Sequence, residues 1–260
     1  MNSDPDLFVF QLSQELHAQV RQVKSFSKVL VNSLEEPTTK QLEFAGFLDG
    51  ATHTLESKLN ALLAYSRIKL NHQFLIESNF SEILQDSFAV FKTRHTGFTY
   101  EIDYACDDDR IKIDMNLFEL VIFEILGNAL KFSDQEQMHM FIRLEQDVEC
   151  LVCRWIDNGA GIPGYLKEKV FQIFNKGERL LDTSGPGMGL SKVQKILALH
   201  DGHISMEVDI REGVEHQIGQ SHCYPVLRLP LAQHSIISPL NSENPDDILK
   251  RIGHKIGMLK

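Results

Sequence analysis

The sequence is poor in the features that mark secreted and membrane proteins. It has only four cysteines in 260 residues, too few and too scattered for a disulfide scaffold. No uninterrupted apolar run approaches the roughly 18–20 residues that a membrane helix requires, and residues 1–6 lack the basic and then apolar layout of a secretory signal. We therefore expect a soluble protein in the cytoplasm, without a membrane segment.

A zinc site is disfavoured by the spacing of the cysteines. Cys150 and Cys153 lie three residues apart in an apolar stretch that is typical of a strand. Side chains three apart in a strand point to opposite faces, so the two thiols would not share a metal ion. Reduced, buried cysteines are the simpler interpretation.

Basic residues are also scarce. Lysine and arginine number 26 against 36 aspartates and glutamates, which gives a net charge of −10. Nucleic-acid-binding proteins usually present a concentrated positive field, so we expect no nucleic-acid partner. Residues 76–232 carry 25 of the acidic and 15 of the basic side chains. A polyphosphate bound there would need a metal ion, backbone amides and a few placed lysines.

The N-terminal part has the periodicity of two helices. Apolar side chains recur every three or four residues over 8–30 and again over 42–62, on either side of a break at Glu35–Thr39. This pattern predicts an antiparallel helical hairpin within residues 1–75. A two-helix hairpin cannot bury its whole apolar surface alone, so we expect a homodimeric four-helix bundle through residues 7–70. The alternative is an internal hairpin that lies on the second domain.

Residues 76–232 alternate between short strands and helices, and the 43% hydrophobic content of the chain is enough for a real core. The expected strands are 100–103, 111–113, 138–146, 149–156, 203–210 and 226–229. The expected helices are 115–132 with Asp114 as N-cap, 170–174 and 190–200. This order favours an α+β protein whose second domain is a two-layer α/β sandwich. The acidic turn Cys106–Asp109 is interpreted as a solvated hairpin tip, and residues 233–260 as a tail with one short helix at 245–252.

A polar stripe interrupts the apolar helix expected at 115–132. Glu124, Asn128 and Lys131 stand at i, i+4 and i+7, within a narrow sector of one helical face. A carboxylate, an amide oxygen and an ammonium group suit a magnesium polyphosphate. A solvent-facing helix edge is the simpler alternative for this stripe alone.

A second motif, Asp157-Asn158-Gly159-Ala160-Gly161, directly follows a predicted strand. A carboxylate at a strand end can accept a hydrogen bond from an exocyclic amine, and glycines allow the backbone to approach a flat ring closely. An ordinary turn would have the same composition.

A third motif, Gly185-Pro186-Gly187-Met188-Gly189-Leu190, opens the helix expected at 190–200. Unpaired amides at a helix N-terminus form an anion site, so this motif favours phosphate. A glycine-rich loop without a ligand is the alternative. The spacing matches neither the dinucleotide fingerprint nor the P-loop.

The order of these motifs resembles a known family. E-x-x-x-N-A-x-K, D-x-G-x-G-I, Phe171 and Phe174, and then G-x-G-x-G-L resemble the nucleotide-binding domain of sensor histidine kinases and of the wider gyrase, Hsp90 and MutL ATPase family. The resemblance covers about 76–232. It implies the Bergerat ATP-binding fold, with ATP and Mg²⁺ as ligands and a lid between the two glycine motifs.

The resemblance also implies roles for single residues. Asn128 would hold magnesium, and Glu124 would polarise the transfer step. Lys131 would contact phosphate, Phe132 would pack near adenine, and Asp157 would take the adenine amino group. The glycines of both motifs and the next residue are further implied nucleotide contacts: Gly159, Gly161, Gly185, Gly187, Gly189 and Leu190. Lys176 and Arg179 would reach the γ-phosphate from the lid.

The N-terminal hairpin resembles the dimerisation and phosphoacceptor hairpin of the same kinases. Ser13–Val20 matches their pattern S-H-E-L-x-x-P-L, with Leu62–Arg67 at the end of the second helix. In this alignment Gln14 stands where the phosphorylated histidine should be, and Gln19 replaces the usual proline. A glutamine amide has no titratable ring nitrogen and is a poor nucleophile, so it cannot form a phosphoramidate. His17, three residues further on, is an alternative acceptor in shifted geometry.

The sequence therefore predicts a histidine-kinase-type signalling protein that binds Mg-ATP, is degenerate in autophosphorylation, and acts on a response regulator or a partner kinase. A deliberate substitution of a natural histidine by glutamine at position 14 would also explain Gln14. One alternative is a non-catalytic scaffold that regulates its partner by contact alone. An anti-sigma-type serine kinase is a third, disfavoured by the hairpin.

Overall fold

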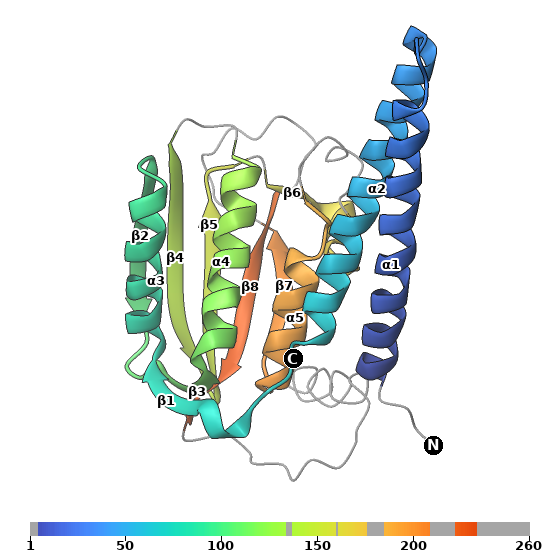
Figure 1. The fold of residues 1–260 in the computed structure, drawn as a ribbon. Coiled ribbons are helices and arrows are strands. Elements are labelled where there is room, and N and C mark those ends of the chain that lie inside the picture. The colour runs from blue at the N-terminus through green and yellow to red at the C-terminus, as the bar shows by residue number, and fades with distance from the viewer. Residues whose placement is uncertain (1–4, 134–136, 160, 176–184, 209–221, 233–260) are drawn as a thin grey trace.

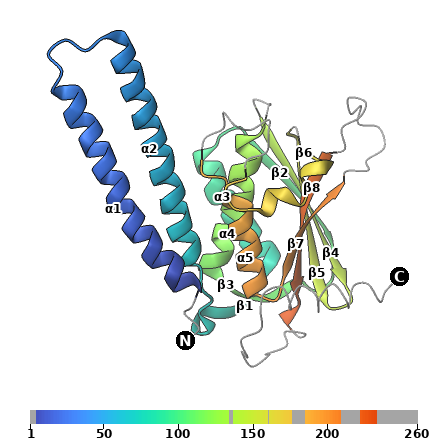
Figure 2. The ribbon, with the colours of Figure 1, turned by 90° about the vertical axis from the view of Figure 1, so that its right-hand side faces the viewer.

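The computed structural model describes residues 5–133, 137–159, 161–175, 185–208 and 222–232. A long helical hairpin stands beside a domain of helices on a sheet (Figures 1 and 2). The tail 233–260, with its predicted helix, lies outside the described residues. The described helices include none long and apolar enough to cross a membrane.

The hairpin consists of α1 (Pro5–Asn32) and α2 (Thr39–Ser66). Thr38 starts α2 with a capping box, in which its side chain accepts from the backbone of Gln41 while the Gln41 side chain accepts from the backbone of Thr38. Some side chains between the helices, such as Val20 and Leu59, are buried at 5% exposure. Many other large apolar side chains of the hairpin stay exposed: Leu12, Leu16, Val23, Phe26, Val29, Leu30, Leu42, Phe44, Phe47, Leu48 and Leu55. The predicted hairpin is confirmed, and the predicted homodimer stays a prediction.

Two sheets follow the hairpin. β1 (Leu75–Asn79) pairs antiparallel with β3 (Arg110–Asp114) in a small sheet. The larger sheet has the order β2-β4-β5-β8-β6, and β7 also pairs with β8. Its strands are β2 (Phe98–Ala105), β4 (Met138–Asp147), β5 (Cys150–Asp157), β6 (Ile162–Pro163), β7 (His203–Val208) and β8 (His222–Pro230). β2 runs parallel to β4, and the other pairs are antiparallel.

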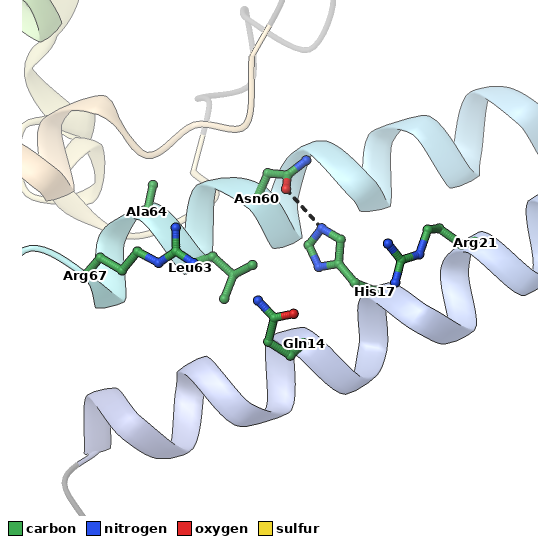
Figure 3. A pocket seen from close by; sticks show the side chains of 7 residues that line it. All are labelled: Gln14, His17, Arg21, Asn60, Leu63, Ala64 and Arg67. Atoms are coloured by element: carbon green, nitrogen blue, oxygen red, sulfur yellow. Dashed lines mark hydrogen bonds between the residues drawn. The ribbon is translucent and has the colours of Figure 1, made fainter.

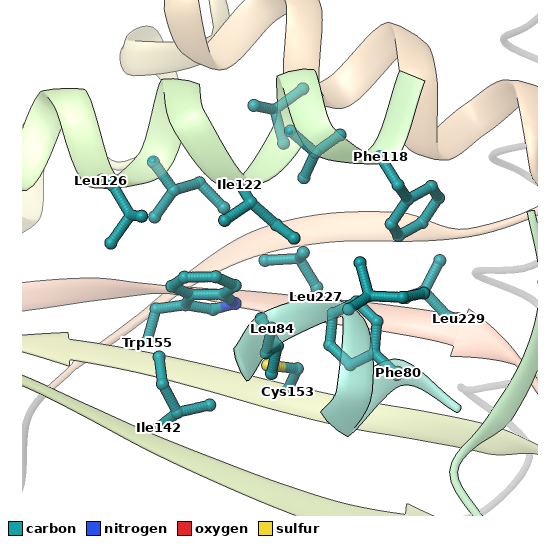
Figure 4. Close-up of a cluster of buried hydrophobic side chains, with 14 of the residues drawn as sticks. Phe80, Leu84, Phe118, Ile122, Leu126, Ile142, Cys153, Trp155, Leu227 and Leu229 are labelled. Carbon is teal, nitrogen blue, oxygen red and sulfur yellow. The ribbon is translucent and has the colours of Figure 1, made fainter. Parts of the chain in front are cut away.

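Three helices, α3 (Phe80–Arg94), α4 (Met115–Lys131) and α5 (Gly189–Leu199), cover one face of the larger sheet (Figure 2). Between the layers lies a continuous apolar core around Trp155, the only tryptophan, which has no exposed surface (Figure 4). Phe88 packs edge-on against Trp155, with ring centroids 5.8 Å apart. The expected α+β fold with a two-layer second domain is confirmed.

The acidic turn is not a hairpin tip. β2 and β3, which flank it, belong to different sheets, because β2 pairs with β4 and β3 pairs with β1. Asp109 instead holds the start of α3. Its backbone oxygen accepts from Phe80 N at 3.0 Å, and its carboxylate accepts from Ser81 N at 2.7 Å.

The helix predicted at 170–174 is also wrong. The structure has a single 3₁₀ turn, η3, at Lys169–Phe171, and Phe174 adopts a left-handed φ of 63°. Two further 3₁₀ turns, η1 (His72–Phe74) and η2 (Gly164–Leu166), connect other elements. A left-handed residue cannot continue a helix, so no regular helix runs through to Phe174.

Candidate functional site

The centre of the site is the C-terminal half of α4. Asp114 caps the helix by accepting from the backbone of Asn116 and Leu117. The apolar face of α4 packs on the sheet through residues such as Ile122 and Leu126, which have no exposed surface. The side chains of Glu124, Asn128 and Lys131 therefore do not pack on the sheet. They face the segment that leads into α5.

The start of α5 lies directly on this stripe. A Cβ atom built on Gly189 would lie 2.8 Å from Glu124 Oε2 and 3.2 Å from Asn128 Nδ2. Only a residue without a side chain allows this approach, because real Cβ atoms do not come that close to other heavy atoms. Glu124 and Asn128 thus face the N-terminus of α5, whose first amides have no partner within the helix.

Lys192 completes this cluster. Its Nζ donates to Glu124 Oε1 at 2.6 Å, and both side chains are partly buried, with 17% and 22% exposure. The sequence interpretation missed Lys192. Its position was a usable signal. A lysine in the first turn of a helix interacts unfavourably with the positive end of the helix dipole, so an anionic neighbour is expected.

The glycine-rich motif places its other residues near the end of α4. Gly185 and Gly187 have left-handed φ values of 107° and 77°. A Cβ atom on Gly185 would lie 3.6 Å from Lys131 Nζ. Leu190 turns partly into the core. Lys131 and the glycine motif, which are far apart in the sequence, therefore meet.

The second motif closes the other side of this helix end. Asp157 Oδ1 accepts from Gly159 N at 2.8 Å, and a Cβ atom on Gly159 would lie 3.1 Å from Phe132 O. Gly161 follows with a left-handed φ of 65°. The carboxylate at the end of β5 thus lies beside the last turn of α4, and Lys131 Nζ lies 5.0 Å from the centre of the Phe132 ring.

Asn158 fixes the position of this turn. Its side chain accepts from His139 N at 2.9 Å and donates to Gln137 O at 2.9 Å. Together these contacts bring all three polar motifs around one end of α4. The lid residues Lys176 and Arg179 fall outside the described residues.

The acceptor position lies on the hairpin. Gln14 is exposed on α1, and His17 Nδ1 donates to Ser13 O at 3.0 Å. The Nε2 atom of His17 lies 3.0 Å from Asn60 Oδ1 on α2 (Figure 3). Both ring nitrogens of His17 are therefore held by neighbours within the hairpin.

Contacts of Lys195 and Lys58 join the hairpin to the second domain. Lys195 on α5 donates to Tyr65 O at 3.1 Å, and its Nζ lies 4.5 Å from the centre of the Tyr65 ring. Lys58 on α2 lies 5.7 Å from the ring centre of Phe174. The end of α2 is thereby held against α5.

A family match covers the part of the chain that carries these motifs. Residues 113–233 match the sequence model of the histidine kinase-, DNA gyrase B-, and HSP90-like ATPase family. The match supports a histidine kinase-type ATP-binding domain. The matched residues extend from β3 through β8 and include all three polar motifs.

The curated relatives that match include a phytochrome-like protein and a sensor histidine kinase. The phytochrome-like protein Cph1 of Synechocystis is 24% identical over 82% of this chain and 28% of its own length. The sensor histidine kinase WalK of Bacillus subtilis is 26% identical over 78% of this chain and 34% of its own length. The chain therefore spans about a third of the length of these relatives.

Solved structures share the fold. The mycobacterial sensor histidine kinase MprB has a TM-score of 0.50 at 20% identity, and the match covers 60% of this chain and 97% of that one. Full-length ShkA in complex with AMPPNP has a TM-score of 0.52 at 20% identity, over 89% of this chain and 47% of that one. The wider coverage of ShkA extends the likeness to most of the hairpin.

Proposed function

We propose that this chain is a histidine-kinase-type signalling protein that binds Mg-ATP at the end of α4 and does not phosphorylate itself at position 14. The observation that carries the proposal is the closeness of Gly189 to Glu124 and Asn128. It brings a helix N-terminus, a carboxylate and an amide to one place. The complex of ShkA with AMPPNP supports the same ligand class.

The donor set suits a polyphosphate with its cation. The amides at the start of α5 and the ammonium group of Lys131 supply positive partners for phosphate oxygens. Within the described ranges no group of three or more histidines, cysteines, aspartates or glutamates could cage a metal ion. A magnesium ion held by Asn128 would therefore take most of its oxygen ligands from phosphates and water, as this cation commonly does.

The other side of the site would select the base. Asp157 would accept a hydrogen bond from the adenine amino group, and Gly159 would leave space for the ring. Phe132 would pack near the ring. Glu124 would polarise the transfer step, and its contact with Lys192 orients its carboxylate and lowers its freedom to turn.

The acceptor position argues against autophosphorylation at residue 14. The Gln14 amide cannot form the phosphoramidate that an imidazole forms. His17 is a weaker alternative, because both of its ring nitrogens are engaged within the hairpin. The chain would then act through ATP-dependent contacts, as a homodimer, on a response regulator or a partner kinase.

A solved complex supports this class of partner. The histidine kinase ThkA in complex with the response regulator protein TrrA has a TM-score of 0.51 at 18% identity. The match covers 85% of this chain and 61% of that one, so it extends beyond the second domain into the hairpin. A response regulator is therefore the first partner to test.

The test of the nucleotide site is a titration with a fluorescent ATP analogue and magnesium. Asn128→Ala and Asp157→Ala should each weaken binding by roughly tenfold or more, because each removes a charge-assisted or metal-linked contact. Asn116→Ala and Asp86→Ala are matched controls, since both side chains are exposed on helices away from the site. Binding that is indifferent to Asn128→Ala and Asp157→Ala would refute the site and favour the non-catalytic scaffold.

A further inference from the structure

Lys192 places a positive charge inside the proposed nucleotide site. It lies in the first turn of α5, where the helix dipole is positive and a lysine is unfavourable without an anionic partner. Its Nζ atom donates to Glu124 Oε1 at 2.6 Å, and the two side chains are largely shielded from solvent, with 17% and 22% exposure. Salt and water therefore screen this pair less than they screen an exposed one.

The pair lies beside the residues that would hold the nucleotide. A Cβ atom on Gly189 would lie 2.8 Å from Glu124 Oε2 and 3.2 Å from Asn128 Nδ2. Lys192 follows Gly189 on the same helix, within one turn of the amides that would receive phosphate. The ammonium group is therefore close enough to act on phosphate charge, and the Glu124 carboxylate is close enough to act on a cation at Asn128.

The charge of the pair determines which form of a nucleotide the site favours. Glu124 alone would make this end of the site negative, so it would repel a polyphosphate and attract a magnesium ion. Lys192 cancels that charge, so the phosphates lose the repulsion and the metal ion loses the attraction. One unit charge a few ångströms away in a partly buried site changes a binding constant by roughly tenfold or more.

The other side chains at the phosphate end point the same way. Lys131 supplies a second ammonium group there, 3.6 Å from where a Cβ atom on Gly185 would lie. Among the residues that the structure describes, no cluster of three or more histidine, cysteine, aspartate or glutamate side chains could hold a metal ion. The amide oxygen of Asn128 is thus the protein ligand proposed for magnesium, and a neutral amide attracts the ion less than a carboxylate would.

We propose that Lys192 is a specificity-determining residue that lets the site bind a nucleoside triphosphate without magnesium. The inference rests on the proposed nucleotide site and deepens it. The Lys192 ammonium group supplies from within the protein part of the positive charge that a magnesium ion brings to the phosphates. Mg-ATP still binds, but the metal ion adds less to the affinity than it would beside an unpaired Glu124.

The experiment titrates the whole chain with a fluorescent ATP analogue at constant ionic strength, once with magnesium and once with EDTA. The wild type should bind the analogue in both conditions. Lys192→Met should raise the ratio of the two affinities by roughly tenfold, mainly by weakening binding in EDTA, because Glu124 then repels the metal-free phosphates. Lys112→Met, at an exposed position on β3, should keep the wild-type ratio.

Two further variants separate the charge of Lys192 from its packing. Glu124→Gln combined with Lys192→Met is neutral again, so the ratio of affinities should return close to the wild-type value. Glu124→Gln alone leaves the ammonium group uncompensated, so it should strengthen binding in EDTA and lower the ratio below that of the wild type. Glu124→Gln keeps Lys192, so it tests the charge effect even if Lys192→Met does not fold.

Failure of this role can be told apart from failure of the site. The role of Lys192 is overturned if the ratio is the same in the wild type, Lys192→Met and Glu124→Gln, or if the wild type binds the analogue only with magnesium. In either case, binding with magnesium that Asn128→Ala weakens would leave the nucleotide site standing. A wild type that binds the analogue in neither condition would refute the proposed function, and the role of Lys192 with it.

Discussion

Lys192 Nζ lies 2.6 Å from Glu124 Oε1 and joins the first turn of α5 to the centre of α4. Glu124 Oε2, the other oxygen of the same carboxylate, lies where a side chain on Gly189 would stand. The Glu124 carboxylate thus contacts the Lys192 ammonium group on one side and lies beside the Gly189 backbone on the other. It is partly buried, so its orientation depends on these two neighbours.

Lys192→Met should destabilise the domain. The change leaves a partly buried carboxylate without its cation, which costs more than loss of an exposed pair and less than loss of a fully buried one. We expect the free energy of unfolding to fall by about 1–2 kcal/mol. Urea unfolding followed by the fluorescence of the buried Trp155 measures it.

A double-mutant cycle separates the pair from its surroundings. Adding Glu124→Gln to Lys192→Met should restore part of the lost stability, because the uncompensated charge is gone. Strictly additive effects of the two substitutions would show that the ion pair contributes nothing. Lys112→Met, at an exposed position on β3, is the control for loss of a lysine.

Gly189→Ala should damage the site directly. The added methyl group would lie 2.8 Å from Glu124 Oε2, so the carboxylate or the start of α5 must move. We expect the affinity for a fluorescent ATP analogue to fall by roughly tenfold. The free energy of unfolding should fall by about 1–2 kcal/mol.

Gly127→Ala on α4 is the matched control for this change. A Cβ atom there meets nothing within 4 Å, so alanine should stabilise the helix by about 0.5–1 kcal/mol without changing the binding of the analogue. Equal losses of analogue binding in Gly127→Ala and Gly189→Ala would show that the closeness of α5 to the stripe is unimportant.

Helical periodicity and glycine placement made much of this structure predictable. The apolar repeat identified α1 and α2, and Asp114 marked the start of α4 correctly, because capping and amphipathic spacing are local properties. The stripe on α4 could be identified from spacing alone. Its meeting with Gly189 could not be derived from spacing, since it depends on how α5 packs on α4.

Two failures of the sequence analysis come from contacts between residues that are far apart in the chain, and one comes from a local backbone conformation. β2 and β3 look like the arms of a hairpin because they are close in sequence, yet their partners β4 and β1 are set by tertiary pairing. Lys192 escaped notice because its partner lies 68 residues away. The apolar residues around Phe171 suggested a helix, but the left-handed Phe174 ends any regular element there.

Acid should destabilise the domain through the buried His200 and the half-buried His203. His200 Nε2 accepts from Asp114 N at 3.0 Å and its Nδ1 donates to Ile196 O at 2.7 Å, so the ring is neutral. Burial lowers the pKa of His200 below the ordinary 6.5, against smaller opposing effects of Ile196, Asp114 and Asp201. Burial also lowers the pKa of His203, with help from the charge of Arg228.

The direction of the pH dependence follows from these lowered pKa values. Above pH 6.5 the two rings are neutral in both the folded and unfolded chain, and their full contribution to stability is present. As the pH falls below 6.5, these histidines are protonated first in the unfolded chain. The free energy of unfolding therefore decreases until the pH reaches the lower pKa values of the folded state. Urea unfolding at about pH 7.5 and about pH 5.5 should show a smaller pH-dependent loss for His200→Gln than for the wild type. His53→Gln, at an exposed position on α2, should keep the wild-type difference, and an unchanged difference in His200→Gln would contradict the assignment.

Gln14→His should restore an acceptor if the nucleotide site at α4 is competent. Residue 14 is exposed on α1, so the substitution should not disturb the hairpin, and an imidazole there has the nucleophilic nitrogen that the amide lacks. With magnesium and ATP radiolabelled on its γ-phosphate, we expect acid-labile label on Gln14→His and none on the wild type. Adding Asn128→Ala to Gln14→His should abolish the label, because transfer then lacks a bound nucleotide. Label on the wild type that disappears in His17→Ala would instead make His17 the acceptor, and would overturn the view that this hairpin is degenerate.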